Sequence, residues 1–302
     1  MRAILTSHLT VSQPLDLAAS LHSGQAHRWE AVEGWHWGVI SGNLIKIRQA
    51  QGDSPDHPYV LAFSSVPKVE PGYLESLLWS YLRLDDDIES IYREITRDPR
   101  VAVMVERYRG LRLLRIEPWE CLISFICSAN SNLPRIHANI AAISEKFGQP
   151  LALEGHVRYT FPSPERLAEA TETDLRVLRL GFRAPYVAQA AQAVAERKLD
   201  LEALRHTPYQ EAKARLMELP GVGPKIADCV LLHSLDKLEA FPIDVWVRRA
   251  LREWYFPSAD SDGGQGPKPP PDRAMLEWAQ KHFGPYAGYA ELYLFHGRRL
   301  SR

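Results

Sequence analysis

The sequence predicts a mainly helical protein that carries a small α+β domain, built on an antiparallel sheet, at its N-terminus. Two observations lead to this fold class. Apolar and polar residues alternate with a period of two in several runs within residues 1–67, as in strands with one buried face. From about residue 71 onward, apolar residues recur at helical spacing instead. We therefore place a domain boundary near residue 110, with an N-terminal domain over 1–110 and a helical body over 111–302.

Strands are predicted in four runs of alternating residues, which are 29–32, 35–40, 43–48 and 60–63. Glu33 and Gly34 separate the first two runs and suit the turn of a hairpin. Residues 52–58 are rich in Gly, Pro and Asp, so they predict a turn before the last run.

Helices are predicted over residues 73–82, 88–95, 99–109, 118–129, 135–147, 167–178, 186–197, 209–219, 225–235, 245–253, 272–283 and 286–297. The run 118–129 is apolar almost all round, so we expect this helix to lie at the centre of the core. Residues 257–271 are rich in Pro, Gly and Ser, and they predict a flexible loop.

The composition by itself favours a metabolic enzyme, because a net charge of −1 is no signature of a nucleic-acid binder. A nucleic-acid binder with this charge must gather its basic residues on one face, or bind phosphates with backbone amides. Cys121, Cys127 and Cys229 lie outside any CxxC pattern, which suits a reducing compartment and argues against a four-cysteine metal site in this chain. With no signal peptide or membrane-spanning run in sight, we expect a cytoplasmic, prokaryotic protein.

A Gly-rich turn joins two of the predicted helices at residues 219–224 (LPGVGP). Gly221 and Gly223 allow positive φ and leave backbone amides uncovered, and Pro224 suits the first position of the next helix. A helix N-terminus with exposed amides can hold a phosphate without any basic side chain. A connection made tight only for packing is the alternative interpretation of the same residues.

Lys225 and Asp244 are the candidate reactive residues near this turn. Lys225 lies in the first turn of a predicted helix, where the positive end of the helix dipole disfavours a protonated amine. The neutral amine is a nucleophile, and a phosphate contact is the other reason for a lysine at this position. Asp244 suits the N-cap of the helix over 245–253, and a catalytic carboxylate is an equally good interpretation.

The stretch from Leu219 to Cys229, followed by residues 242–245 (PIDV), resembles the helix–hairpin–helix–GPD superfamily of DNA base-excision glycosylases. Within it, the chain is similar to the 8-oxoguanine DNA glycosylase/AP lyases. Four other segments carry the resemblance in the family's order, namely residues 23–29, 110–130, 180–186 and 284–290. The resemblance implies a helix–hairpin–helix DNA glycosylase fold with an additional antiparallel sheet domain.

The resemblance also implies the reaction and the partner, which is double-stranded damaged DNA. The target base is extruded from the stack. The amine at Lys225 then attacks C1′ of the deoxyribose and displaces the base, while Asp244 stabilises the charge that develops on the sugar. The lysine forms a Schiff base, and β-elimination nicks the strand 3′ to the lesion. We expect a monomer that works at the nucleoid and not at a membrane, with no required cofactor or metal. A monovalent cation at the hairpin carbonyls is the one ion left open.

The resemblance assigns further positions one by one. The base pocket comprises Gly24, whose carbonyl accepts from N7–H of 8-oxoguanine, with Cys229 and Phe295 on the faces of the base and Glu291 at its Watson–Crick edge. The estranged cytosine is the base left behind in the other strand. Four residues contact it or wedge beside it, namely Asn130, Arg135, Phe182 and Arg183. Residues at the DNA backbone are Gly221, Gly223 and Trp246. Without the resemblance, Gly24 would be a turn glycine, Cys229 a core residue, and Arg135 and Arg183 solvated charges. For Phe295, a core position and a stacking position would then be equally good interpretations.

Four positions depart from the family pattern. Glu291 stands where the family usually has glutamine, which adds charge to the pocket. Phe182 replaces a tyrosine, Trp246 replaces a histidine, and Ser131 interrupts a run of asparagines. We therefore expect weaker selectivity for cytosine opposite the lesion.

Two other functions stay open. Glu291 is compatible with a glycosylase of the same superfamily that removes other damaged purines, such as alkylated ones. A non-catalytic helix–hairpin–helix module that only tethers DNA is the alternative from a different class. The presence of both Lys225 and Asp244 argues against it, because phosphate binding alone requires neither.

Overall fold

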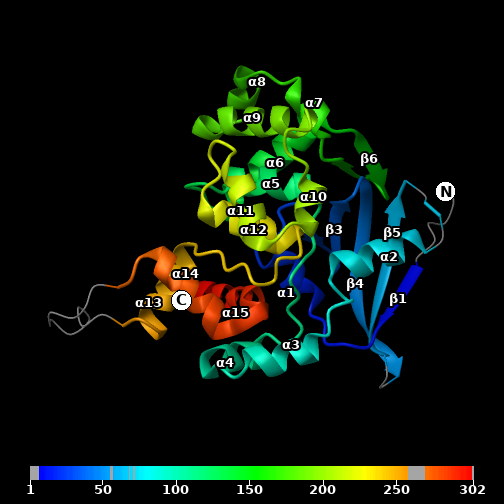
Figure 1. Cartoon of the computed structure of the whole chain (residues 1–302). Coiled ribbons are helices and arrows are strands. Elements are labelled where there is room, and N and C mark those ends of the chain that lie inside the picture. Colours follow the sequence, from blue (N-terminus) through cyan, green and yellow to red (C-terminus); the bar gives the residue numbers. More distant parts are fainter. Residues whose placement is uncertain (1–6, 55–56, 68, 71, 258–268, 301–302) are drawn as a thin grey trace.

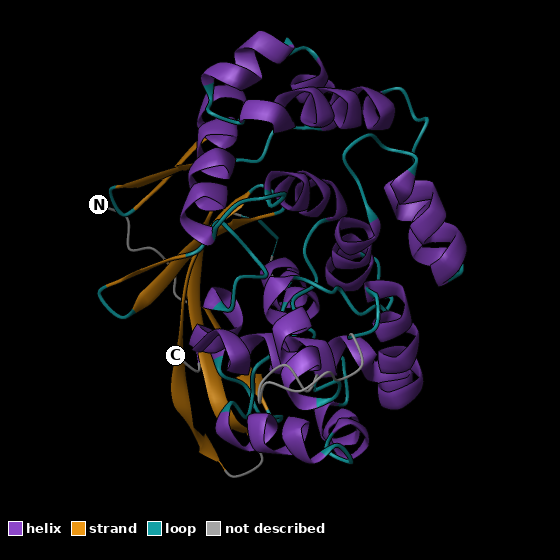
Figure 2. Ribbon diagram, turned by 90° about the vertical axis from the view of Figure 1, so that its left-hand side faces the viewer, coloured by secondary structure: helices purple, strands orange, loops and turns teal. Residues whose placement is uncertain are grey.

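The computed structural model describes residues 7–54, 57–67, 69–70, 72–257 and 269–300. In Figure 1 an antiparallel sheet in blue and cyan stands beside a larger body of helices, and Figure 2 shows the strands along one side of that body. The chain is therefore mainly helical with a sheet near its N-terminus, as the hydrophobic periodicity predicts.

The sheet has five strands in the order β1-β5-β4-β3-β2. Their bounds are β1 (Ser7–Val11), β2 (Glu30–Val32), β3 (Trp35–Ile40), β4 (Asn43–Ser54) and β5 (His57–Val66). The predicted hairpin is confirmed, with Glu33 and Gly34 both at positive φ. Two predictions were incomplete. The edge strand β1 was not foreseen, and most of the expected turn at 52–58 belongs to β4 and β5, which pair as far as Ser54 and His57.

Both faces of the sheet are covered, which a period of two does not reveal. Ile45 and Phe63 pack into the main core, whereas Leu44 and Trp37 join a smaller cluster on the other face. That cluster is closed by Leu153 of a second hairpin, β6 (Pro150–Leu153) and β7 (His156–Tyr159), which the sequence did not indicate.

The helices of the first half are α1 (Leu17–His22), α2 (Tyr73–Tyr81), α3 (Ile88–Ile95), α4 (Pro99–Arg107), α5 (Pro118–Cys127) and α6 (Leu133–Phe147). Those of the second half are α7 (Pro164–Ala168), α8 (Glu172–Val177), η1 (Gly181–Arg183), α9 (Ala184–Ala195), α10 (Leu201–His206), α11 (Tyr209–Met217), α12 (Pro224–Ser234), α13 (Val245–Trp254), α14 (Asp272–Phe283), η3 (Gly284–Tyr286) and α15 (Ala287–Leu300).

Most helix predictions are confirmed, and the errors have local causes. The expected helix over 167–178 is two helices, because Thr171 forms a capping box with Asp174 and starts α8 anew. The helices α1 and α10 were missed, since six residues are too few to show a helical period. As expected, α5 lies in the core, with nine of its ten residues buried.

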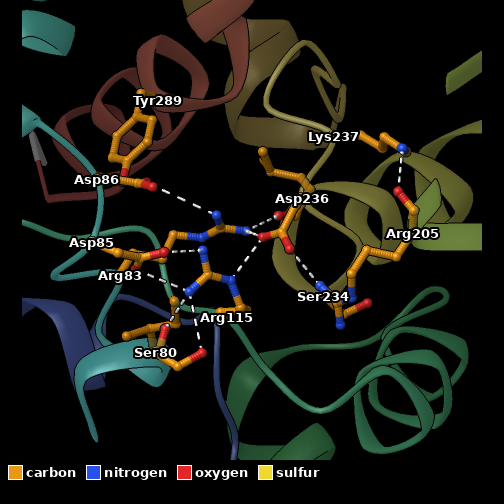
Figure 3. Close-up of polar contacts among 12 residues, drawn as sticks. Ser80, Arg83, Asp85, Asp86, Arg115, Arg205, Ser234, Asp236, Lys237 and Tyr289 are labelled. Atoms are coloured by element: carbon orange, nitrogen blue, oxygen red, sulfur yellow. Dashed lines mark hydrogen bonds and ion pairs between the residues drawn. The ribbon is translucent and has the colours of Figure 1, made fainter. Parts of the chain in front are cut away.

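One hydrophobic core runs across the boundary predicted near residue 110, because Leu17, Leu113 and Ile126 belong to the same cluster. Ion pairs also tie distant segments together (Figure 3). Asp236, just after α12, accepts from Arg83 at 2.7 Å and from Arg115 at 2.8 Å. The expected flexible loop at 257–271 falls largely on residues 258–268, outside the described residues.

Within the described ranges, no helix has the length and apolar character needed to cross a bilayer. In the same part of the chain, no cluster of three or more His, Cys, Asp or Glu side chains is arranged to hold a metal ion.

Candidate active site

A cavity of about 480 Å³ lies between the first turns of α12 and α13 and one face of α15. In Figure 1 the red helix α15 lies beside α13 and α14. The lining includes seven of the residues proposed from the sequence, namely Gly24, Lys225, Cys229, Asp244, Trp246, Glu291 and Phe295. Residues from four distant segments thus meet at one hollow.

A larger hollow of about 910 Å³ lies on another side of Lys225, lined mainly by α11, α12 and α14. It contains neither Asp244 nor any residue proposed for the base pocket. The smaller cavity, in which Lys225 and Asp244 meet, is therefore the candidate active site.

The turn before α12 uses its two glycines differently. Gly221 has φ +83°, and a Cβ there would lie 2.5 Å from the ring of Tyr186, so both backbone and space require glycine. Gly223 was expected to use positive φ, but its φ of −90° is an ordinary extended conformation. As the N-cap of α12, Gly223 offers no side-chain capping bond, and Pro224 begins the helix. The first-turn amides of α12 are thus free of a side-chain cap and can meet a phosphate.

Lys225 lies half-buried at the cavity wall. Its Nζ lies 3.3 Å from Oγ of Ser128 and 5.2 Å from the centre of the Phe125 ring. Among the described residues, no carboxylate lies within 4.0 Å of this amine. The amine therefore has weak contacts with Ser128 and Phe125 and no ion pair within the described part of the chain.

Asp244 caps α13, as predicted, and also faces the cavity. Its Oδ1 accepts from the amides of Trp246 and Val247, each at 2.8 Å. Its Oδ2 makes no hydrogen bond within the described part of the chain. Burial raises the pKa of Asp244, and the two amide bonds and nearby Lys225 oppose that rise. The cap thus fixes one oxygen and leaves the other for a substrate.

Glu291 is a buried acid in the same cavity, with 6% of its surface exposed. Its carboxyl has no hydrogen-bond partner among the described residues. Burial raises the pKa of Glu291 well above its usual value, the carboxylate of Asp244 adds to the rise, and Lys225 opposes it. An unpartnered buried carboxyl is costly, so a ligand group is the natural partner for it.

Cys229 and Phe295 each lie one helical turn beyond a central residue, Lys225 on α12 and Glu291 on α15. Both line the cavity, and burial raises the pKa of the Cys229 thiol to about 12. Cys229 is therefore a neutral, apolar wall and no second nucleophile.

The residues proposed for the estranged base lie outside the cavity, on adjoining turns. Asn130 and Arg135 are exposed, and Phe182 projects from η1 with 47% of its surface exposed. Arg183 is buried, so it is no solvated charge. It donates through Nε to the Ala129 carbonyl at 2.8 Å, and it shapes the loop that carries Asn130.

Among the lining residues that the sequence did not indicate, three carry titratable side chains, namely His27, His233 and Arg299. The imidazoles of His27 and His233 are buried, which lowers both pKa values to about 3, so both are neutral. Arg299 lies near the end of α15. In the sequence, Arg299 looks like a basic residue that complements the dipole of a helix C-terminus, and no signal marks the histidines.

Known DNA repair proteins resemble this chain over most of its length. Residues 8–122 match the family described as "8-oxoguanine DNA glycosylase, N-terminal domain", and residues 123–265 match "HhH-GPD superfamily base excision DNA repair protein". The chain is 33% identical to the "Probable N-glycosylase/DNA lyase" of Methanothermobacter thermautotrophicus, over 95% of this chain and 94% of that protein. It is 32% identical to "N-glycosylase/DNA lyase OGG1" of Arabidopsis thaliana, over 93% of this chain and 76% of that protein.

Among solved structures, the chain resembles the Clostridium acetobutylicum 8-oxoguanine glycosylase/lyase in complex with duplex DNA that has cytosine opposite 8-oxoguanine. The TM-score is 0.85 at 29% identity, over 99% of each chain. These matches cover both the sheet region and the helical body. The chain belongs to the N-glycosylase/DNA lyases of the HhH-GPD base-excision DNA repair superfamily.

Proposed function

We propose that this protein excises 8-oxoguanine from duplex DNA with Lys225 as the nucleophile, and then cleaves the strand by β-elimination. The observation that carries the proposal is the meeting of Lys225, Asp244 and the base-pocket residues in one cavity. An amine without an ion-pair partner and a carboxylate with one free oxygen are the two groups that such a displacement needs.

In the first step, the neutral Nζ of Lys225 forms a bond to C1′, and the bond from C1′ to N9 breaks. The electron pair of that bond leaves with the base, which takes up a proton. Asp244 stabilises the positive charge on the sugar, because its Oδ2 is free while Oδ1 is held by two amides.

In the second step, Nζ of Lys225 loses its extra proton and the bond from C1′ to O4′ breaks. O4′ takes up a proton as a hydroxyl, and C1′ and Nζ form an iminium ion. A proton then leaves C2′, and the 3′ phosphate leaves as the double bond forms. The iminium is the electron sink for this elimination, so no oxidant, metal or further cofactor is required.

The DNA is held by groups in and beside the wall of the cavity. The uncapped amides at the start of α12 suit a backbone phosphate, and the indole N–H of Trp246 suits a second. Exposed Phe182 fits beside the estranged base, with Asn130 and Arg135 at its edge. We further propose that the protein acts as a monomer on the chromosome of a prokaryotic cell, with at most a monovalent cation at the hairpin carbonyls.

A second candidate is removal of alkylated purines, and Glu291 is the observation that favours it. A carboxylate accepts from N1–H and N2–H of a guanine-type base, and it also attracts a purine made cationic by alkylation. Excision of 7-methylguanine tested beside 8-oxoguanine separates the two candidates.

The experiment for the main proposal is borohydride trapping on duplex DNA that carries 8-oxoguanine opposite cytosine. A covalent adduct is expected with the unaltered protein and absent from Lys225→Gln. Base release without any adduct would contradict lysine attack. If neither base release nor an adduct is observed, the choice of 8-oxoguanine as substrate is contradicted. Repeating the assay with each opposite base tests the weaker selectivity expected from Phe182 and Ser131.

A further inference from the structure

Arg299 borders the place proposed for the base, next to Gly24. It lines the cavity, and its guanidinium carbon lies 5.5 Å from the centre of the Phe295 ring. Its Nη1 lies only 3.2 Å from the point that a Cβ on Gly24 would occupy. Gly24 has φ +102°, which favours glycine, and the absence of a side chain lets the guanidinium approach.

The donors of this guanidinium are mostly unused. Nη2 donates to the carbonyl of His22 at a long 3.4 Å. Nε is buried and has no hydrogen-bond partner among the described residues, and Nη1 makes no hydrogen bond to them either. Within the same ranges, no carboxylate lies within 4.0 Å of Arg299.

Arg299 is half-buried, and Nε is the part of its guanidinium that is shielded from solvent. Desolvation lowers the pKa of Arg299, and only the more distant carboxylate of Asp244 opposes this. Buried donors without partners are rare in folded proteins, and at a cavity wall they indicate an acceptor supplied by a ligand.

We propose that Arg299 is a specificity-determining residue that donates a hydrogen bond to O8 of the extruded 8-oxoguanine. The inference rests on the proposed function and deepens it. O8 and N7–H are neighbours on one edge of this base, so the Gly24 carbonyl and the Arg299 guanidinium would read them side by side, as acceptor and donor.

Guanine offers the opposite pattern on that edge. It has a lone pair at N7, which faces the Gly24 carbonyl unfavourably, and only a hydrogen on C8. A purine alkylated at N7 also lacks both the N–H and the oxygen. A site built to hydrogen-bond a substrate group rejects analogues that lack the group, because its own polar atoms are then left unpaired.

The test measures binding to duplexes that contain either 8-oxoguanine or guanine opposite cytosine. Both are measured in a Lys225→Gln background, which keeps the base in place. Arg299→Met is expected to weaken binding to the 8-oxoguanine duplex about 10- to 100-fold and binding to the guanine duplex less than about threefold. Arg299→Gln, which keeps a donor of similar reach, is expected to lose less.

Arg298→Met is the matched control, because the guanidinium of Arg298 pairs with Glu253 at 2.9 Å. Equal losses on both duplexes, or no loss, would overturn the assignment, since a phosphate contact or a purely structural role predicts those results. If the parent protein neither prefers nor excises 8-oxoguanine, the proposed function fails first. If the parent protein prefers and excises 8-oxoguanine, and Arg299→Met keeps the same preference for 8-oxoguanine over guanine, only the role of Arg299 is contradicted.

Discussion

Two lysine–aspartate pairs involve α12, and they differ in whether the amine and the carboxylate form an ion pair. Lys213 and Asp228 form a closed pair at 2.7 Å, and the hydroxyl of Tyr209 donates to the other carboxylate oxygen at 2.7 Å. Lys225 and Asp244 form an open pair, in which the amine has no carboxylate within 4.0 Å and one carboxylate oxygen is unused. The closed pair joins α11 to α12, whereas the open pair leaves its groups to a substrate.

The closed pair shows how desolvation and charge attraction balance at a buried carboxylate. Burial raises the pKa of Asp228 even though Lys213 and Tyr209 oppose the rise. Desolvation thus outweighs attraction for this carboxylate, and removing one partner would leave a buried charge uncompensated. The two pairs therefore predict opposite outcomes when the lysine is removed.

The largest expected effect is on catalysis. Lys225→Gln should reduce base excision and strand cleavage by at least about 10⁴-fold, because the bond to C1′ is made by this amine. Its free energy of unfolding should change by less than about 1 kcal/mol, since the contacts of the amine in the described residues are a long hydrogen bond to Ser128 and the ring of Phe125. Single-turnover assays and denaturant unfolding measure the two quantities, and a loss of more than about 3 kcal/mol would make Lys225 structural.

The second effect is on stability. Lys213→Gln should lower the free energy of unfolding by about 3–5 kcal/mol, because it leaves Asp228 buried and unpaired. The double variant Lys213→Gln with Asp228→Asn should regain part of that loss. Denaturant melts give both values, and a single variant as stable as the parent protein would show that the closed pair does not hold the helices.

The third effect divides the two roles of Asp244. Asp244→Asn should keep the N-cap, since asparagine caps as well as aspartate, but lose about 10²- to 10⁴-fold in excision rate. Asp244→Ala should lose similar activity and also about 1 kcal/mol of stability. Equal rates for Asn and Asp would make this residue only a cap.

The smallest effect is the pH dependence of stability at Glu291. Because its pKa is raised on folding, the folded protein holds the proton more tightly, so stability is full below the ordinary value of 4.5 and is lost as pH rises towards the folded pKa. Glu291→Gln should therefore gain stability relative to the parent protein as pH rises. Urea melts from pH 4 to pH 8 measure the difference in free energy of unfolding between Glu291→Gln and the parent protein. The substitution of exposed Glu211 by Gln is the control. A constant gap would show that Glu291 does not titrate in this range.

Much of this protein followed from local sequence. The period of two predicts the hairpin at Glu33 and Gly34, and the apolar run at 118–129 predicts the buried helix α5. Capping by Asp244 and the helix start at Pro224 are decided within a few residues, so short-range chemistry is enough to predict them. The resemblance at residues 219–229 and 242–245 is enough to predict that Lys225 and Asp244 share one site.

Only the tertiary structure decided the rest, because those properties depend on residues far apart in the chain. The second hairpin that covers the sheet, the burial of Arg183 and the neutral histidines at the cavity wall all follow from long-range packing. The same holds for Arg299. Arg299 lies beside Gly24 although the two residues are far apart in the sequence. No local sequence pattern predicts that its Nε will lack a hydrogen-bond partner after folding.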